Sequence, residues 1–193
     1  MDTISALGGI AAAFGLSTSA GLNAYIPLLL VALAARFPSD APWIRLSEPY
    51  DVITNGWIIG ALVVLLLIEM LVDKIPAVDT LNDMIQTFIR PAAGAFLFAA
   101  NAEVISDASP VLAVIAGLLV AGSVHATKGA VRPAVTATTA GTGNWLVSLL
   151  EDIVAFFLSL LSILLPLLAF VVLLLLVFFA VRFVRRRRKR RAV

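Results

Sequence analysis

The residues best able to do chemistry in this sequence are charged side chains placed at the ends of long apolar stretches. Glu69 and Asp73 are four residues apart and share one helix face, as do His125 and Lys128, which are three apart. An isolated charge at membrane depth is costly, so such groups pair with one another or line a cavity. We therefore expect one charge cluster near a membrane boundary. The predicted cluster is Glu69, Asp73, Lys74, Asp79, His125, Lys128, Arg132, Glu151 and Asp152.

This charge cluster has two interpretations. The first is functional: the charges form an ion or proton pathway, or an anchor for a charged headgroup. The second is structural: the charges form ion pairs that fix the register of the helices. His125 has the side-chain type that titrates near neutral pH, although a lone histidine at a helix end is typical of a hydrogen-bonding interface residue. The simplest pairings are Glu69 or Asp73 with Lys128, and Glu151 or Asp152 with Arg132 or His125.

Two short stretches of small and polar residues resemble each other. Residues 19–25 and 139–145 both read hydroxyl, Ala, Gly, then Asn and an aromatic residue, with one insertion. Polar breaks in corresponding positions of two halves indicate a transporter site, and the helix N-termini that follow favour anions. Chance similarity is the alternative, because Ala, Gly and Thr are abundant here. The predicted pathway residues are Ser19, Gly21, Asn23, Tyr25, Thr139, Gly141 and Asn144.

Catalysis has little support in this sequence. There is no cysteine and a single histidine, which excludes disulfides, Cys-ligated metals, thiol chemistry and a His-rich metal site. The usual nucleophile, zinc-protease and phosphate-loop motifs are absent as well. We therefore expect no enzyme, no metal and no cofactor, with an intramembrane enzyme that acts on lipid as an alternative.

The composition places these residues in a membrane protein. Hydrophobic residues make up 61% and charged residues 13% of the 193 residues, and the mean hydropathy is +1.05. Soluble domains are roughly 45–50% apolar and about 25% charged. Eight of the 14 Lys and Arg residues lie in 182–191, a tail suited to anionic lipid. The remainder is acidic, so nucleic-acid binding is not expected.

The long apolar stretches predict an all-α fold, a polytopic transmembrane helical bundle. Residues 1–181 form a single transmembrane domain, and residues 182–193 form a basic cytoplasmic tail. About six membrane segments are expected, some of them broken or short: 4–36, 55–73, 90–105, 109–127, 145–164 and 166–184.

The first of these segments is long for one crossing. Its polar and small residues at 17–23 favour unwinding, which predicts two helical pieces at about 4–16 and 22–36. A straight, tilted helix is the alternative.

Proline residues suggest further boundaries. Residues 79–88 predict a short amphipathic helix, after which Pro91 opens the third segment. Residues 133–143 are expected to be irregular. Pro166 divides the last apolar region into two segments that meet in a tight bend, with one long kinked helix as the alternative.

The Lys and Arg residues near the segment ends predict the orientation. With the tail in the cytoplasm and six crossings, two basic residues fall outside, Arg36 and Arg45, and four fall inside: Lys74, Arg90, Lys128 and Arg132. This bias supports six crossings, or five plus a re-entrant piece. It predicts that the N- and C-termini are both cytoplasmic.

Five motifs together resemble a family of bacterial multi-pass membrane proteins classed as a domain of unknown function. They are SAGLNAYIP from Ser19, DKIPAVD from Asp73, RPAAG from Arg90, HATKGAVR from His125, and Glu151-Asp152. The resemblance covers roughly residues 5–170. It implies a small helical membrane protein of the bacterial cytoplasmic (inner) membrane, and it supplies no activity.

These observations predict a small transporter or channel for a small solute, an ion or a lipid headgroup. Its site is expected where the breaks at 17–23 and 138–144 meet, with the charge cluster as gate or coupling residues. The alternative is a non-catalytic membrane scaffold or assembly partner. The expected partners are the lipid bilayer, anionic lipid at the tail, and a second copy in a homodimer.

Overall fold

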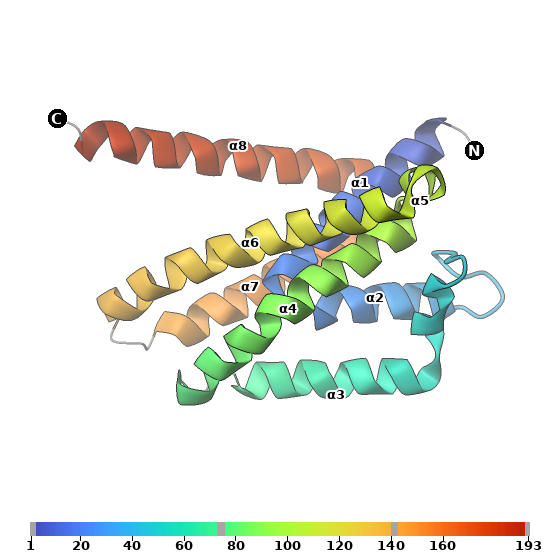
Figure 1. Cartoon of the computed structure of the whole chain (residues 1–193), viewed down its shortest axis with the longest axis horizontal. Coiled ribbons are helices and arrows are strands. Elements are labelled where there is room, and N and C mark those ends of the chain that lie inside the picture. The colour runs from blue at the N-terminus through green and yellow to red at the C-terminus, as the bar shows by residue number, and fades with distance from the viewer. Residues whose placement is uncertain (1–2, 73–75, 140–142, 192–193) are drawn as a thin grey trace.

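The chain folds into a bundle of helices, seen in a computed structural model that describes residues 3–72, 76–139 and 143–191 (Figure 1). All regular elements in these ranges are helical, which confirms the predicted all-α bundle. The elements are α1 (Thr3–Leu22), α2 (Tyr25–Arg36), the short 3₁₀ helix η1 (Tyr50–Thr54), α3 (Gly56–Val72), α4 (Pro76–Asn101), α5 (Glu103–Ala108), α6 (Pro110–Thr139), α7 (Gly143–Leu164) and α8 (Pro166–Arg191).

Three of these helices, α1, α6 and α7, are long and apolar enough to cross a membrane. Helices α2 and α3 and residues 166–179 of α8 are shorter apolar helices. Large apolar side chains face outward along α3, α7 and α8, whereas the core between α1, α4 and α6 is rich in alanine. This arrangement suits a lipid environment, and the chain is a helical membrane protein.

The first apolar stretch breaks at Asn23 and Ala24, later than predicted. Residues 17–22 stay helical in α1, so the expected unwinding there is wrong. Two of the three hydroxyl groups, those of Ser17 and Ser19, bond to neighbouring helices, and the third, Thr18 Oγ1, donates to the carbonyl oxygen of Phe14 one turn earlier, which is compatible with a helix. Ser17 Oγ donates to the carbonyl oxygen of Gly94 at 2.8 Å, and Ser19 Oγ donates to that of Ala155 at 2.7 Å.

The break reverses the chain, so that α1 and α2 form a hairpin (Figure 1). The beginning of α1 and the end of α2 lie at one end of the bundle, and α8 finishes at the opposite end. The two ends of the chain therefore lie at opposite ends of the long axis. The first segment, which was counted as a single crossing, is therefore a pair of antiparallel helices.

Helix α4 is one continuous helix, although two separate pieces at 79–88 and 90–105 were expected. Pro91 lies inside it. A proline within a helix removes one backbone hydrogen bond, but the helix can continue when tertiary contacts hold both sides. Arg90 on one side is in a buried ion pair. Gly94 on the other side packs so closely on α6 that an added Cβ would lie 2.9 Å from the carbonyl oxygen of Gly117.

Helix α6 extends to Thr139, through residues expected to be irregular. Its threonine hydroxyl groups donate to carbonyl oxygens one turn earlier, as Thr136 Oγ1 does to Arg132 at 3.1 Å. At the other end of the sequence, α7 ends at Leu164 and α8 begins at Pro166 and runs back along the bundle (Figure 1). The last apolar region therefore has two helical segments that meet at Leu165.

Candidate functional site

A buried ion pair between α3 and α4 lies at the centre of the candidate site. Arg90 Nη2 donates to Glu69 Oε1 at 2.9 Å, and the two side chains are 1% and 2% exposed. Glu69 was a predicted site residue, but its expected partner, Lys128, was wrong. Arg90 was used only for orientation. Its position inside an apolar helix was the signal that it needs a buried partner.

His125 on α6 joins this pair. Its Nδ1 lies 3.3 Å from Arg90 Nη1, and its Nε2 lies 3.1 Å from Thr87 Oγ1. A guanidinium group only donates hydrogen bonds, so Nδ1 must accept and carries no proton. The hydrogen bonds therefore fix the neutral tautomer with its proton on Nε2, which donates to Thr87.

Two further polar side chains extend the site toward α2. Tyr25 on α2 and Gln86 on α4 are both buried, and their side chains interact. Gln86 is one helical turn before Arg90, so both point to the same side of α4. Within the described residues, Gln86 Oε1 and Arg90 Nε are buried without a hydrogen-bond partner. Buried polar atoms are usually satisfied, so these two are candidate contacts for water or solute.

A second group of charges links α6 to α7. Lys128 Nζ lies 2.7 Å from Glu151 Oε2, and Arg132 Nη2 donates to Ser148 Oγ at 2.7 Å. Lys128 therefore pairs with an acidic residue of α7, whereas Glu69 pairs with Arg90. Both basic side chains are buried, so their charges are removed from water and held by α7.

Asn23 connects the helix break to this second group. Its Oδ1 accepts hydrogen bonds from the backbone N–H groups of Tyr25 and Ile26 at 3.0 and 3.1 Å, which caps the N-terminus of α2. Its Nδ2 donates to Asp152 Oδ1 at 2.9 Å. The capping bonds fix the orientation of the amide, so the acidic residue of α7 is held at the positive end of a short helix.

The other predicted pathway residues do not converge on this point. Ser19 and Gly21 pack α1 against its neighbours, and an added Cβ on Gly21 would lie 2.6 Å from the carbonyl oxygen of Ala121. Asn144 Nδ2 donates to Thr136 Oγ1 at 2.9 Å. Since Asn144 precedes Asp152 by eight residues, about 12 Å of helix, the two breaks do not meet as expected.

The remaining predicted residues divide between α6 and the undescribed parts of the chain. Thr139 Oγ1 donates to the carbonyl oxygen of Val135 at 2.8 Å and accepts from the N–H of Gly143, so it closes the end of α6. Asp73, Lys74 and Gly141 lie outside the described residues, and the side chain of Asp79 is not described either.

The family described as a domain of unknown function (DUF4126) matches residues 10–186. The chain belongs to this family. The resemblance seen in the five motifs is confirmed, and the DUF4126 match reaches into the basic tail. No curated protein and no solved structure matches the sequence.

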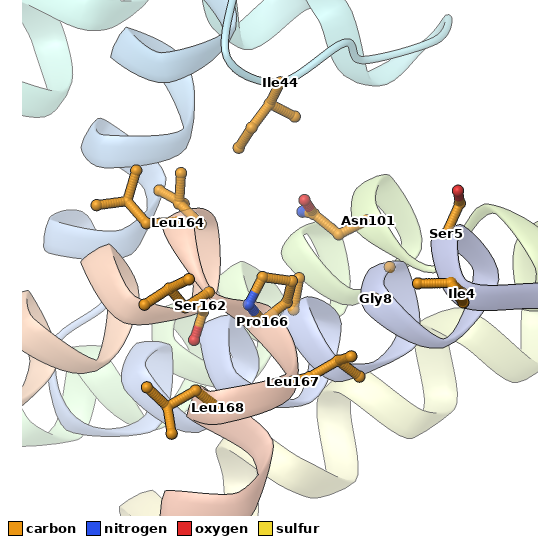
Figure 2. A pocket seen from close by; sticks show the side chains of 14 residues that line it. Ile4, Ser5, Gly8, Ile44, Asn101, Ser162, Leu164, Pro166, Leu167 and Leu168 are labelled. Carbon is orange, nitrogen blue, oxygen red and sulfur yellow. The ribbon is translucent and has the colours of Figure 1, made fainter.

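Apolar cavities accompany the polar site of this DUF4126 protein. One of about 590 Å³ lies away from the charges, between the start of α1, the end of α4 and the α7–α8 bend. Figure 2 shows the Asn101 amide and Pro166 at its wall. A cavity of about 330 Å³ lies between α2, α3 and α7 and includes Asp152, and one of about 220 Å³ lies between α2 and α7. Among the described residues, no group of acidic or histidine side chains can hold a metal ion.

Proposed function

We propose that this DUF4126 protein is a transporter or channel for a small solute, an ion or a lipid headgroup. The observation that carries the proposal is the bond from Asn23, at a helix break, to Asp152 inside the bundle. Membrane transporters use broken helices in this way, because a half-helix brings its polar end to a site within the bilayer.

The depth of the break supports this proposal. Helix α2 has 12 residues, which at 1.5 Å each is about 18 Å. The hydrocarbon core of a bilayer is about 30 Å thick. A helix of this length that starts at the membrane surface near Arg36 does not reach the other surface, so its beginning at the Asn23–Ala24 break lies inside the core, beside α1, α6 and α7, which are long enough to cross a membrane.

The charge distribution supports an orientation. The ends of α6 and α8 lie opposite to the end of α2 (Figure 1). Ten of the 14 basic residues belong to the second half of α6 or to the end of α8, and Arg36 ends α2. The positive-inside rule then puts the ends of α6 and α8 on the cytoplasmic side of the inner membrane, with the basic tail on anionic lipid and the beginning of α1 on the other side.

A scaffold is the second candidate, and the pairing of charges favours it. Glu69 with Arg90 and Lys128 with Glu151 each join two helices through a short, shielded ion pair. In a scaffold, the sole role of such pairs is to fix the register of the packed helices. The two candidates differ in one property, because a pathway admits water at the polar core and a scaffold keeps it dry.

Cysteine labelling tests this difference, since the chain has no native cysteine. Asn23→Cys and Gln86→Cys would be treated from each side with a membrane-impermeant maleimide, with exposed Asp107→Cys as the positive control and Leu174→Cys as the lipid-facing control. We expect both core cysteines to react and Leu174→Cys not to react. Failure of both core positions from either side, in protein that still unfolds cooperatively, would refute the pathway and leave the scaffold.

A further inference from the structure

The cavity of about 590 Å³ at the α7–α8 bend owes its space to small residues on one side of α1. These residues are Gly8, Gly9 and Ala12. An added Cβ on Gly8 would still lie 3.7 Å from Pro166 Cγ, so the start of α8 leaves room for a side chain here. Along α1 the lining runs from Ile4 to Ala12, which is about 12 Å of helix. A space of this volume is typical of a small-molecule pocket.

The walls of this cavity are apolar and open toward lipid. No charged side chain is among its lining residues, which around the bend are mainly leucine and isoleucine. Leu165 and Leu167 are 54% and 49% exposed, so the cavity reaches the outer surface of the bundle. In a membrane protein this surface contacts the bilayer. A ligand that enters from there and fits these walls has an apolar, uncharged body.

A second cavity continues the apolar surface. Its volume is about 220 Å³, and it lies between α2 and α7. Ile163 lines both cavities, while the adjacent residues Trp43 and Ile44 line one each. A long apolar chain that starts in the larger cavity can therefore extend past Ile163 toward α2.

The amide of Asn101, the last residue of α4, lies at the wall of the larger cavity between Ile44 and Pro166 (Figure 2). Its Nδ2 donates to the carbonyl oxygen of Leu97 at 2.8 Å, which fixes the orientation of the amide. None of the described residues donates to its Oδ1. An amide oxygen can accept two hydrogen bonds, and the bilayer core has no water to supply them. A ligand with a hydrogen-bond donor would satisfy this oxygen.

We propose that this cavity binds a neutral lipid alcohol, a long apolar chain with a hydroxyl group that donates to Asn101 Oδ1. The apolar walls select the chain, the lack of charge selects a neutral molecule, and the amide oxygen selects the hydroxyl group. This inference goes beyond the proposed function and does not rest on it, because neither Asn23 nor Asp152 lines either of these two cavities.

Photolabelling of the full-length protein in proteoliposomes tests the site. The probe is hexadecanol with a diazirine on its chain, and mass spectrometry of the peptides locates the label. We expect the label to concentrate on residues 4–12 and 162–168, and unlabelled hexadecanol to compete for it. Hexadecyl methyl ether has the same chain without a donor. Since it lacks one neutral hydrogen bond, it should compete roughly three- to tenfold less well.

Three variants separate the acceptor from the space. Asn101→Leu keeps the size of the side chain and removes the acceptor, so the alcohol and the ether should compete equally and as weakly as the ether does in wild type. Gly8→Leu fills the cavity and should abolish labelling at residues 4–12 and 162–168. Gly60→Leu is the matched control, since an added Cβ there has open space, and it should label as wild type does. Cooperative thermal unfolding shows that each variant is folded; if Gly8→Leu is not, Asn101→Leu decides.

Several results would overturn the proposal. Equal competition by alcohol and ether in wild type, or unchanged labelling in Asn101→Leu, would leave a groove filled by ordinary lipid chains. A label spread evenly over the lipid-facing sides of α3 and α8 would mean the same. Stronger competition by palmitate than by hexadecanol would refute a neutral ligand. The maleimide test at Asn23→Cys is separate, so failure of the pathway would leave this site intact, and failure of this site would leave the pathway.

Discussion

Replacing Glu69 by glutamine removes one charge from the buried pair with Arg90 and keeps the shape of the side chain. At 2.9 Å and an effective dielectric constant of about 20, the attraction between the two charges is about 6 kcal/mol. Desolvation of both groups offsets much of this value, and removal of one partner of a buried pair usually costs about 3–5 kcal/mol. Glutamine still offers an oxygen to Arg90, so we expect the lower limit, about 3 kcal/mol.

Thermal unfolding of the purified protein measures this loss. For a chain of this size each kcal/mol shifts the Tm by roughly 2–4 °C, so Glu69→Gln should melt about 6–12 °C below wild type. Arg90→Met should lower the Tm at least as much, because it leaves a buried carboxylate. The double variant has no buried charge to compensate and should regain most of the loss. Glu48→Gln, on an exposed loop, serves as the control and should not change the Tm.

Two results would refute this reasoning. One is a Glu69→Gln protein that melts within about 2 °C of wild type, which would mean that the pair contributes little. The other is a double variant that is destabilised by the sum of the two single changes, since the two side chains would then act independently. If the double variant is stable, its uptake activity in proteoliposomes separates the two functions: lost uptake assigns the pair to the pathway, and intact uptake assigns it to structure.

Two other predictions concern packing and topology. Gly94→Val should prevent close contact between α4 and α6, so that the purified protein does not remain folded in detergent, as measured by gel filtration. Gly60→Ala, with open space around its Cβ, is the control and should behave as wild type does. Equal behaviour of the two variants would contradict the packing argument. Thr3→Cys and Arg182→Cys should react with an impermeant maleimide from opposite sides of the membrane, and labelling from the same side would contradict the hairpin.

The membrane-protein class and the helical bundle follow from composition and apolar stretches, because both depend on residue type more than on partners. Asn23 could be recognised as special, since a polar residue between apolar helices needs a reason to be there. Its role as a cap of α2 could not be predicted, because that depends on where the chain turns. Ser17 and Ser19 stay in the helix because their hydroxyl groups donate to the carbonyl oxygens of Gly94 and Ala155, which are far away in sequence.

The pairing of charges could be predicted only in part. The depth of Glu69 required that it have a partner, and Lys128 was expected as the simplest one, while Arg90 was placed at the start of a separate segment at 90–105. Once α4 continues through Pro91, Arg90 is held on a long helix beside α3 and reaches Glu69 first. Of the two residues in this ion pair, Glu69 was therefore selected correctly by its depth in the membrane, and Arg90 was missed.

Helix α6 explains how the same contacts can serve both structure and movement. His125, Lys128 and Arg132 are spaced i, i+3 and i+7, which places them along one side of the helix. His125 contacts Arg90 on α4, whereas the other two contact α7. Helix α7 cannot slide by a turn relative to α4 unless one of these sets of contacts breaks. The charges thus hold the bundle in one register.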